Sequence, residues 1–443
     1  MYKFHLGPAA LYDMEEILDG RTLEIETIED VRKESQARSG RRLRLIRLKF
    51  TSQDWHGFRW NHRASIYLPD NYQPGGNVGI IGTNREFAEP GNEREFIPGT
   101  GLRTDSEYAE GTAIDLGIPI MIFGTPDEEI NGMDESDLMG FSMLKMLESG
   151  DLTWSGYYAI AKSYLRAITL MQSHSDIQGQ KALLLGCSKR GSAVCICTGV
   201  DPGRIAGIMA TCYPGGNHLN MMALKYYNFG PDIGGPFEER TGPGFQPAKI
   251  LLRAINHPIG FGNLMAYDPY LWRDRIQAAF LVAIGTNDEF FGLGTPNEMM
   301  EHLLGDKAFL AIDNLPHTWV SQKHLAAWRM WLMHTFEGRK IPKVEMRSEA
   351  TATQLKVSAT VVFDEDFETV KLYYAYNPVN DWRFSQWESQ EMVRGDGEYT
   401  GLIQRRPGEN LAYYVEVSHN GWGGRGYVSS LVETLRFDQK TSH

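Results

Sequence analysis

Ser188, Asp288 and His317 are the residues of this sequence whose types, taken together, can do covalent chemistry. A serine hydroxyl is a poor nucleophile until a neighbouring base takes its proton. Histidine titrates near neutral pH, so it can accept that proton and later return it to a leaving group. A carboxylate on the far ring nitrogen holds the histidine in the required tautomer and stabilises the imidazolium. The three types therefore predict acyl transfer through an acyl-serine.

The serine lies in the hexapeptide Gly186-Cys187-Ser188-Lys189-Arg190-Gly191. The apolar run before it, residues 182–185, predicts a buried strand, and the small residues after it, 192–197, favour a helix. A serine flanked by glycines at such a turn is typical of a nucleophile elbow. Glycines are needed because the turn is tight and bulky neighbours clash. A lone Gly-x-Ser is also a common simple turn, so the interpretation depends on partners elsewhere in the chain.

Asp288 and His317 each follow an apolar run that predicts a buried strand, residues 278–285 and residues 308–312. Ligands of open α/β sheets gather at the carboxyl ends of the strands, so we expect both side chains at one edge with Ser188. Taken singly, Asp288 also fits a helix N-cap, and His317 fits an ordinary loop histidine. The chain order Ser, Asp, His favours the catalytic interpretation, because a nucleophile elbow is followed by its acid and then its base.

Backbone N–H groups supply the oxyanion hole of such a site. We expect one donor at Lys189, directly after the serine, and the other at Thr83 or Asn84, after a predicted strand over 78–82.

Four cysteines lie near the elbow in sequence: Cys187, Cys195, Cys197 and Cys212. They lack paired Cys-x-x-Cys spacing, so packing is the expected role, with a metal site as the minor alternative. The sequence predicts no metal and no cofactor.

The strands and helices that are expected to position these residues indicate an α/β domain followed by an all-β domain. Residues 1–40 are polar and are expected to form an N-terminal extension. Over 41–340, buried strands alternate with helices, which predicts a mostly parallel sheet covered on both faces. A glycine- and proline-rich stretch at about 213–275 predicts a cap-like insertion over the serine, with a surface decoration as the alternative. Short β-like runs over 345–443 predict a β-sandwich of immunoglobulin or fibronectin type.

The C-terminal residues carry two further expectations. The short linker after Phe336 and the glycine-rich loop 420–426 favour a domain that shapes access to the active site, with a passive β-module as the alternative. Trp382, Trp387 and Trp422 are expected in the sandwich core or in packing between domains, because aromatic side chains dominate core burial. A surface on which sugars stack is the alternative for these three tryptophans.

The composition and net charge of the chain limit the classes of molecule that it is expected to bind. The chain has 443 residues, 42% hydrophobic residues and a formal net charge of −12, values typical of a soluble globular protein and unfavourable for a nucleic-acid partner. No apolar run reaches the roughly 18 residues of a membrane span. No signal-peptide core is seen near the N-terminus, and unbridged cysteines fit a reducing compartment, so a cytoplasmic location is expected.

Several motifs resemble the PhoPQ-activated pathogenicity-related proteins. They are Gly186–Gly191, Tyr267–Tyr270, Asn287–Phe291, Asn314–His317, Thr51–Trp55, Trp60–Pro69 and Asp381–Trp387. The resemblance extends over about residues 45 to 430 and implies an α/β-hydrolase fold with a poorly defined substrate. The Gly-Cys-Ser-basic run is also similar to glucuronoyl esterases, which cleave carbohydrate esters, although Lys189 stands where those enzymes carry arginine.

We therefore expect a serine hydrolase that acts on a carboxylic ester. A serine peptidase of the prolyl-oligopeptidase-like branch is one alternative, because ester and peptide hydrolysis use the same catalytic groups. A peptidase often needs an acidic anchor for a free amino terminus, and Glu238 and Glu239 in the insertion are candidates. A degenerate hydrolase that only binds is the other alternative, and an intact set of three residues disfavours it. The expected partner is a small molecule or a peptide.

Overall fold

The computed structural model of the chain describes residues 4–83, 104–126, 132–133, 135–230, 256–421 and 424–438. The chain divides into two compact units. The first is made of Met1–Ala210, Pro236–Phe280 and Leu304–Asp306. The second is made of Thr211–Gly235, Leu281–Leu303 and Lys307–His443. Each unit therefore draws on segments that are distant in sequence.

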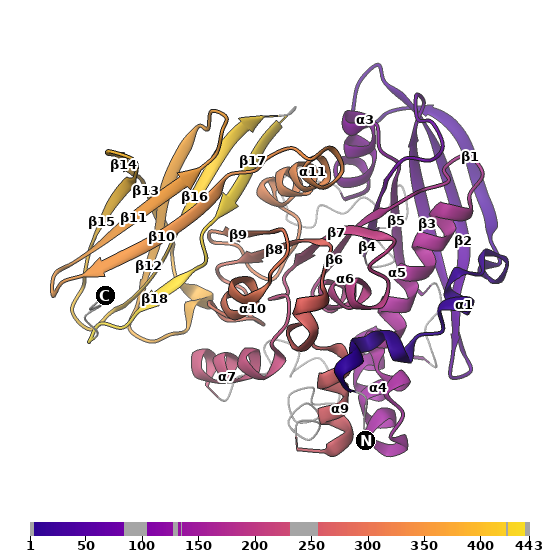
Figure 1. Cartoon of the computed structure of the whole chain (residues 1–443), viewed down its shortest axis with the longest axis horizontal. Helices are drawn as coiled ribbons and strands as arrows, with labels where there is room; N and C mark the ends of the chain where they lie inside the picture. The colour runs from indigo at the N-terminus through magenta and orange to yellow at the C-terminus, as the bar shows by residue number, and fades with distance from the viewer. Residues whose placement is uncertain are drawn as a thin grey trace. The chain divides into compact units, whose positions relative to one another are not determined.

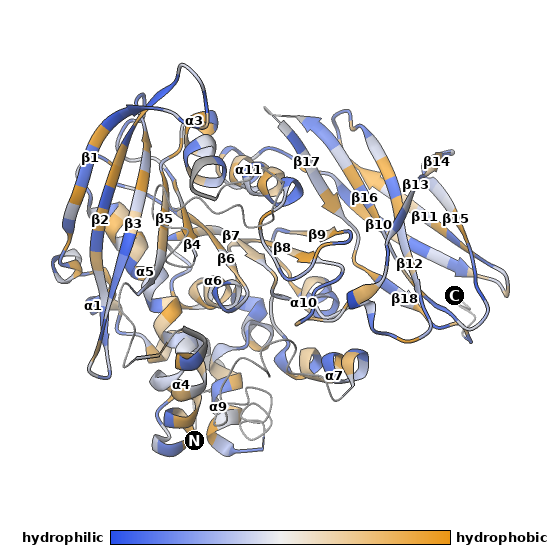
Figure 2. Ribbon diagram, turned by 180° about the vertical axis from the view of Figure 1, so that it is seen from behind, coloured by the Kyte–Doolittle hydropathy of each residue, from blue (hydrophilic) through white to orange (hydrophobic). Residues whose placement is uncertain are grey.

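A mixed, mostly parallel sheet forms the centre of the first unit (Figure 1), with the strand order β1-β2-β3-β5-β4-β6-β7. The strands are β1 (Glu26–Glu34), β2 (Arg42–Trp55), β3 (Phe58–Pro69), β4 (Val78–Gly82), β5 (Ile120–Pro126), β6 (Ala182–Cys187) and β7 (Ile205–Thr211). Strands β1, β2, β3 and β5 pair antiparallel in that order, whereas β4 runs parallel to both β5 and β6. The inner strands β4, β5, β6 and β7 are mostly buried, and hydrophobic colours predominate along them in Figure 2, as expected where helices cover both faces of a parallel sheet.

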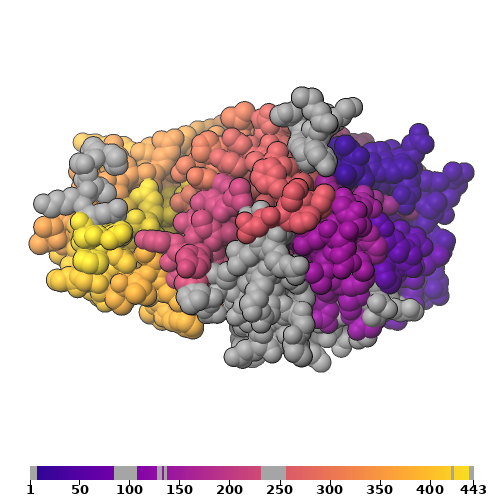
Figure 3. All heavy atoms as spheres, turned by 90° about the horizontal axis from the view of Figure 1, so that it is seen from below, coloured from indigo at the N-terminus to yellow at the C-terminus, as the bar shows by residue number. Residues whose placement is uncertain are grey.

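Helices of the first unit cover this sheet and connect its strands. They are η1 (Phe4–Leu11), α1 (Met14–Leu18), η2 (Gly20–Leu23), η3 (Thr104–Gly111), α3 (Thr112–Leu116), α4 (Glu135–Ser149), η4 (Leu152–Trp154), α5 (Gly156–Ser173), α6 (Lys189–Val200), α9 (Pro258–Tyr267) and η6 (Pro269–Arg275). Helix α5 is buried along most of its length and packs against α6, β2 and β4. Helices α4 and α9 pack against each other on the side of the molecule shown in Figure 3.

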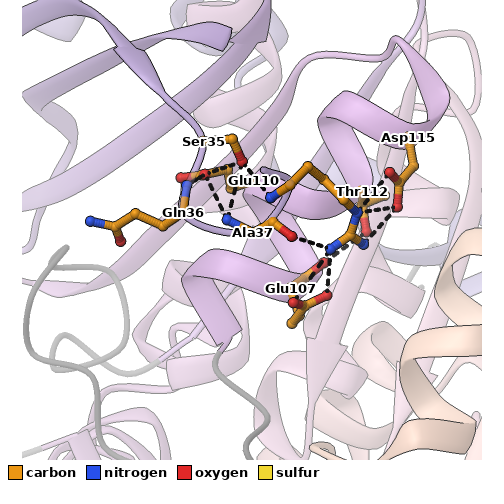
Figure 4. Close-up of polar contacts among 8 residues, drawn as sticks. Ser35, Gln36, Ala37, Glu107, Glu110, Thr112 and Asp115 are labelled. Carbon is orange, nitrogen blue, oxygen red and sulfur yellow. Dashed lines mark hydrogen bonds and ion pairs between the residues drawn. The ribbon is translucent and has the colours of Figure 1, made fainter. Parts of the chain in front are cut away.

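A buried carboxylate holds the turn between β1 and β2 (Figure 4). Glu110 of η3 is 1% exposed and accepts hydrogen bonds from Ser35 Oγ (2.6 Å) and from the backbone N–H groups of Gln36 (2.6 Å) and Ala37 (3.2 Å). Lys33 Nζ lies 2.8 Å from its other oxygen. Burial opposes the charge, but these donors hold the pKa of Glu110 below its usual value. The polar edge strand β1 is thereby anchored to the unit through an ionised group.

The second unit contains the two strands that lead to Asp288 and His317, namely β8 (Ala279–Gly285) and β9 (Lys307–Ile312). Its helices are α7 (His218–Phe229), α10 (Asn297–His302), α11 (Gln322–Glu337) and η7 (Trp382–Phe384). Its remaining strands are β10 (Lys343–Ala350), β11 (Gln354–Val362), β12 (Thr369–Asn377), β13 (Glu388–Glu391), β14 (Val393–Arg394), β15 (Tyr399–Gln404), β16 (Asn410–Gly421), β17 (Gly424–Ser429) and β18 (Glu433–Leu435). Insertion residues 231–255, which include Glu238 and Glu239, lie outside the described residues.

Strands β10 to β18 form two antiparallel sheets, one in the order β10-β11-β15-β14 and one in the order β13-β12-β16-β17, with β18 paired to β16. The two sheets contact each other: Oγ of the half-buried Ser348 on β10 lies 2.8 Å from the hydroxyl of the buried Tyr413 on β16. Trp382 and Trp387 are buried, as expected, and Trp422 lies outside the described residues. A mostly parallel sheet with helices, followed by antiparallel sheets, confirms the predicted α/β-hydrolase fold and β-rich C-terminus.

Lys323 ties helix α11 to the C-terminal sheets. Its Nζ donates to Glu416 (2.6 Å), a buried carboxylate of β16, and to Asp313 (2.9 Å), which directly follows β9. Ser429 of β17 accepts a hydrogen bond from the backbone N–H of Ala311 in β9 (2.8 Å). These contacts fasten β9 and α11 to the C-terminal sheets. Among the described residues, no helix is long and apolar enough to cross a membrane.

Two glycines end the strands that lead into the candidate loops, and both are required by close backbone contacts. A Cβ atom on Gly186, at the end of β6, would overlap the carbonyl group of Arg190. A Cβ atom on Gly285, the last residue of β8, would overlap the carbonyl oxygen of Leu315 and lie 2.8 Å from that of Pro316. Backbone atoms cannot rotate away as a side chain can, so glycine is needed to let these segments approach.

Replacing Gly285 with Ala is expected to destabilise the protein by about 1–3 kcal/mol, the usual range for overpacking. The midpoint of denaturant unfolding measures the loss. Gly203→Ala is the matched control, because the nearest atom to its added Cβ would be 3.8 Å away. Equal midpoints for the two variants would contradict the close approach at Gly285.

Burial lowers the pKa of His324 on α11 to about 3, whereas an exposed histidine titrates near 6.5. The side chain is 0% exposed, and its Nδ1 lies 3.0 Å from Ser321 Oγ. The folded protein therefore keeps His324 neutral at pH values where the unfolded chain takes up a proton. Stability from this group is complete above pH 6.5 and falls as the pH decreases towards 3.

Lowering the pH from 8 to 5 is expected to remove about 2 kcal/mol of stability through His324 alone. The measurement is the difference in denaturation midpoint between wild type and His324→Gln at several pH values, since a glutamine does not titrate. Subtracting the two curves removes the contribution of other ionisable groups. Parallel curves between pH 8 and pH 5 would show that His324 is not a buried neutral base.

Candidate active site

Ser188 occupies a strained turn between β6 and α6 in the first unit. Its backbone has φ 57° and ψ −121°, a conformation rare for a residue with a side chain. The strand ends at Cys187, and the helix begins at Lys189, so the whole reversal is made at one residue. This is the geometry expected of a nucleophile elbow, which raises the serine above the end of its strand.

The hydroxyl of Ser188 is not used to cap its own helix. Serine at an N-cap position ordinarily accepts a hydrogen bond from the second or third N–H of the helix, but Ser188 makes no such bond to α6. The residue is half-buried, so its side chain is accessible. Ser192, the other serine of this segment, is 0% exposed and therefore protected from reagents. Ser188 is the serine of the pair that can meet a substrate.

The two predicted oxyanion donors differ in their surroundings. Lys189 is the first residue of α6 and directly follows Ser188, the position expected of an oxyanion donor. The N–H of Thr83, in contrast, donates to the carbonyl of Phe123 in β5 at 2.9 Å, so it is engaged in the sheet. This pairing argues against Thr83 as a donor. Asn84 lies outside the described residues, so its assignment stays a prediction.

The carboxylate of Asp288 is fixed by both of its oxygens. Oδ1 accepts hydrogen bonds from the backbone N–H groups of Phe290 (2.8 Å) and Phe291 (2.9 Å), and Oδ2 lies 2.8 Å from His317 Nδ1. The residue is 3% exposed. Asp288 is not a helix N-cap, because the next helix, α10, begins only at Asn297. Its contacts to Phe290 and Phe291 hold a turn and orient the carboxylate towards the histidine.

The contact with Asp288 sets the tautomer of His317. An ionised carboxylate can only accept, so Nδ1 carries the proton, and the lone pair is on Nε2. Phe290 lies edge-on to the imidazole with ring centroids 4.5 Å apart, and Phe291 lies tilted at 5.9 Å. The histidine side chain is 13% exposed. The ring is thus held between aromatic groups, with Nε2 in the form that a general base needs.

The loops after β8 and β9 are bonded to each other as well. The backbone N–H of Asn287 donates to the carbonyl of Leu315 (3.0 Å), and Thr286 Oγ1 accepts from the N–H of Asn314 (3.0 Å). Glu289 Oε2 accepts from the N–H of His317 (2.8 Å). Glu289 directly follows Asp288 in the sequence, but no sequence pattern signals its contact to the backbone N–H of His317.

Cys212 is a residue that sequence reasoning left out of the site. It directly follows β7, and its thiol lies 2.9 Å from the carbonyl of Thr318. Donor atoms of Cys212, Asp288 and His317 all lie within 4.8 Å of one another, the one such grouping among the described residues. A thiolate, an imidazole and a carboxylate are suitable ligands for zinc. Here the carboxylate and imidazole are already bonded to each other, an arrangement that suits a base and its orienting acid.

The structure brings Asp288 and His317 together in the second unit, from loops that a helix and a strand separate in sequence. Ser188 belongs to the first unit, at the end of β6. Its pairing with His317 stays a prediction. Chemically, the second unit supplies an oriented base, and the first supplies an accessible serine on a strained turn.

Solved structures with a similar fold include several esterases. The acetyl xylan esterase from Paenibacillus sp. R4 is 15% identical, with a TM-score of 0.47 over 74% of this chain and 92% of that one. Acetyl xylan esterase 1 from Thermoanaerobacterium sp. is 14% identical, with a TM-score of 0.43 over 75% and 96%. An S-formylglutathione hydrolase from Agrobacterium tumefaciens is 14% identical, with a TM-score of 0.37 over 71% and 96%.

The match of this chain to a protein family is stronger evidence of relationship than its similarity to these solved structures. A search of the curated proteins found no match. The model of the PhoPQ-activated pathogenicity-related protein family, in contrast, matches residues 31–383, which include the elbow, both candidate loops and the segment around Trp382. This range covers most of the chain and agrees with the resemblance carried by the motifs. The chain belongs to the PhoPQ-activated pathogenicity-related protein family.

Proposed function

We propose that the protein is a serine hydrolase that cleaves carboxylic esters, with Ser188 as nucleophile, His317 as general base and Asp288 as its orienting acid. The observation that carries the proposal is the 2.8 Å contact between His317 Nδ1 and Asp288 Oδ2. This contact places the ring proton on Nδ1, so Nε2 carries the lone pair that a base needs. The histidine itself lies in the loop after β9. The strained turn at Ser188 supplies the second requirement, an accessible hydroxyl at the start of a helix.

The reaction follows from these groups. Nε2 of His317 takes the proton of Ser188 as Oγ forms a bond to the ester carbonyl carbon, and the carbonyl electrons move onto oxygen. The N–H of Lys189 is the proposed donor to that oxygen. The oxyanion then collapses, the bond to the leaving alkoxide breaks, and the imidazolium returns its proton to the alkoxide. Asp288 remains ionised throughout and stabilises the imidazolium.

Water completes the cycle by the same route. Nε2 takes a proton from water as the water oxygen bonds to the acyl carbon. Collapse of the second oxyanion then breaks the bond between the acyl carbon and Ser188 Oγ, Oγ takes the proton back from the imidazolium, and the acid is released. The mechanism needs Nε2 unprotonated at the start.

An ester substrate requires only these groups, and for that reason we prefer it. The peptidase alternative requires an anchor for a peptide terminus as well, and its candidates, Glu238 and Glu239, lie outside the described residues. Turnover of p-nitrophenyl acetate and butyrate, compared with aminoacyl p-nitroanilides, separates the two classes. Faster cleavage of the anilides would favour the peptidase. Failure on both sets, with no covalent labelling, would favour a binding protein.

Ser188→Ala is expected to abolish covalent labelling by a fluorophosphonate probe while the protein stays folded. The probe phosphonylates an activated serine, and alanine has no hydroxyl to react. Mass spectrometry of the labelled wild type should find the adduct on the peptide that holds Ser188. Ser192→Ala is the matched control and should label normally, because that side chain is buried. An adduct on any other serine contradicts the assignment.

Asp288→Asn is expected to lower kcat on the order of 10³–10⁴-fold, the range seen when a triad aspartate becomes an amide. The N–H groups of Phe290 and Phe291 require an acceptor, so the amide oxygen stays with them and the NH₂ group faces His317. Nδ1 must then accept, which transfers the ring proton to Nε2 and blocks the base. Glu289→Gln is the control, since its oxygen can still accept from the His317 N–H. A silent Asp288→Asn with a damaging Glu289→Gln would reverse the roles.

A further inference from the structure

We propose that the segment Asp381–Trp387, which connects two strands of the C-terminal sheets, positions the active site by holding both candidate loops. It does so through the side chains of Asn287 and Asn314. The inference rests on the proposed function, because it concerns the alignment of Asp288 and His317. It assigns these two asparagines a role as positioning residues, distinct from the groups that touch the substrate.

Asn287 joins the loop of Asp288 to this segment. Its Nδ2 donates to the carbonyl of Ser385 at 2.8 Å and to the carbonyl of Arg383 at 3.1 Å. Both amide hydrogens are thereby used. Its Oδ1 accepts from Thr286 Oγ1 at 2.8 Å. These three hydrogen bonds restrain the side chain, and through it the position of the next residue, Asp288.

Asn314 joins the loop of His317 to the same segment. Its Oδ1 accepts from the backbone N–H of Trp387 at 2.8 Å and from Gln386 Nε2 at 3.1 Å. Its Nδ2 donates to the carbonyl of Trp387 at 3.2 Å. The amide therefore pairs with the backbone of Trp387 in both directions, as a neighbouring strand would. Two residues, Leu315 and Pro316, separate this anchor from His317.

The segment Asp381–Trp387 is held in place by its own hydrogen bonds and packing, so it can fix the positions of the two candidate loops. Asp381 accepts from the guanidinium of Arg383 through both oxygens, at 2.8 and 2.6 Å. Asn377 at the end of β12 donates to Asp381 O (2.8 Å) and Ser385 Oγ (2.9 Å). Trp387 is 4% exposed and packs against Tyr414 of β16, with ring centroids 5.5 Å apart. The segment thus belongs to the sheet rather than to a free loop.

The positioning of the two candidate loops can be tested separately from the attachment of the C-terminal sheets to the other elements of the second unit. Lys323 with Glu416, Ser429 with Ala311 and Asn297 with Val432 also join the C-terminal sheets to the helices and strand of the second unit. These contacts remain when Asn287 or Asn314 is changed. A displacement of about 1 Å in a catalytic group costs on the order of 10²-fold in rate. Loss of the asparagine contacts should therefore reduce catalysis without detaching the sheets.

The test uses the full-length chain with Asn287→Ala, Asn314→Gly and the double variant. Glycine is chosen at 314 because the backbone there has φ 54°, which glycine adopts without strain. Asn297→Ala is the matched control: its Nδ2 also donates to a C-terminal carbonyl, that of Val432 at 2.9 Å, but it lies on α10, outside both loops. Circular dichroism and the denaturation midpoint report whether each variant folds like the control.

We expect each loop variant to lower kcat on p-nitrophenyl acetate by about tenfold or more, with KM within about threefold of wild type. A proton NMR resonance from His317 Nδ1–H, assigned by its loss in His317→Gln, should shift or broaden in the loop variants and stay unchanged in Asn297→Ala. A purely structural loss would lower the denaturation midpoint and leave the resonance of the folded fraction in place.

Unchanged turnover and an unchanged Nδ1–H resonance in the double variant would overturn the inference. Failure of the proposed function would be seen separately, as absence of fluorophosphonate labelling at Ser188 in the wild type. In that case the NMR resonance still reports whether Asp381–Trp387 holds the histidine and aspartate. If wild type and the double variant label at the same rate, only the positioning role fails.

Discussion

One hydrogen bond, between His317 Nδ1 and Asp288 Oδ2, is the contact on which the remaining features of the second unit depend. It has a direction, because a carboxylate can only accept, and that direction fixes the reactive form of the imidazole. A bond of this kind is useful only if neither partner can move. The backbone N–H groups of Phe290 and Phe291 hold the carboxylate, and the aromatic rings of the same two residues enclose the imidazole. The strands β8 and β9 deliver the two loops, and the glycine at position 285 allows them to approach.

Much of this could be predicted from the sequence because it depends on local patterns. The unbroken apolar runs of β6, β8 and β9 are buried on both faces, and such strands carry a strong signal. Gly186 precedes the elbow at Ser188 because the backbone of Arg190 leaves no room for a Cβ atom there. Asp288 is the first carboxylate after the apolar run of β8, and it is the residue bonded to His317.

Other features could not be predicted, because they depend on pairings between distant backbones and side chains. The N–H of Thr83 looked suitable for an oxyanion, yet it completes the pairing of β4 with β5. Residues 26–34 are polar and looked like an extension, but they form the edge strand β1, which needs one hydrogen-bonded neighbour and almost no buried face. Asn287 and Asn314 belonged to motifs that carried the family resemblance. Nothing in those motifs indicates that their amides bind the backbone of residues 383–387, some 70 to 100 positions later.

The discontinuous composition of the second unit has a consequence for the order of events during synthesis. Residues 211–235 and 281–303 belong to the same compact unit as residues 307–443, so they must wait for partners that the ribosome makes later. Contacts of such long sequence separation form slowly, and a growing chain folds its N-terminal parts first. A nascent chain that ends before Asp381 already contains Asp288 and His317, but it lacks the backbone that the loops of these two residues bind. Maturation of the second unit is thereby coupled to synthesis of the C-terminal sheets.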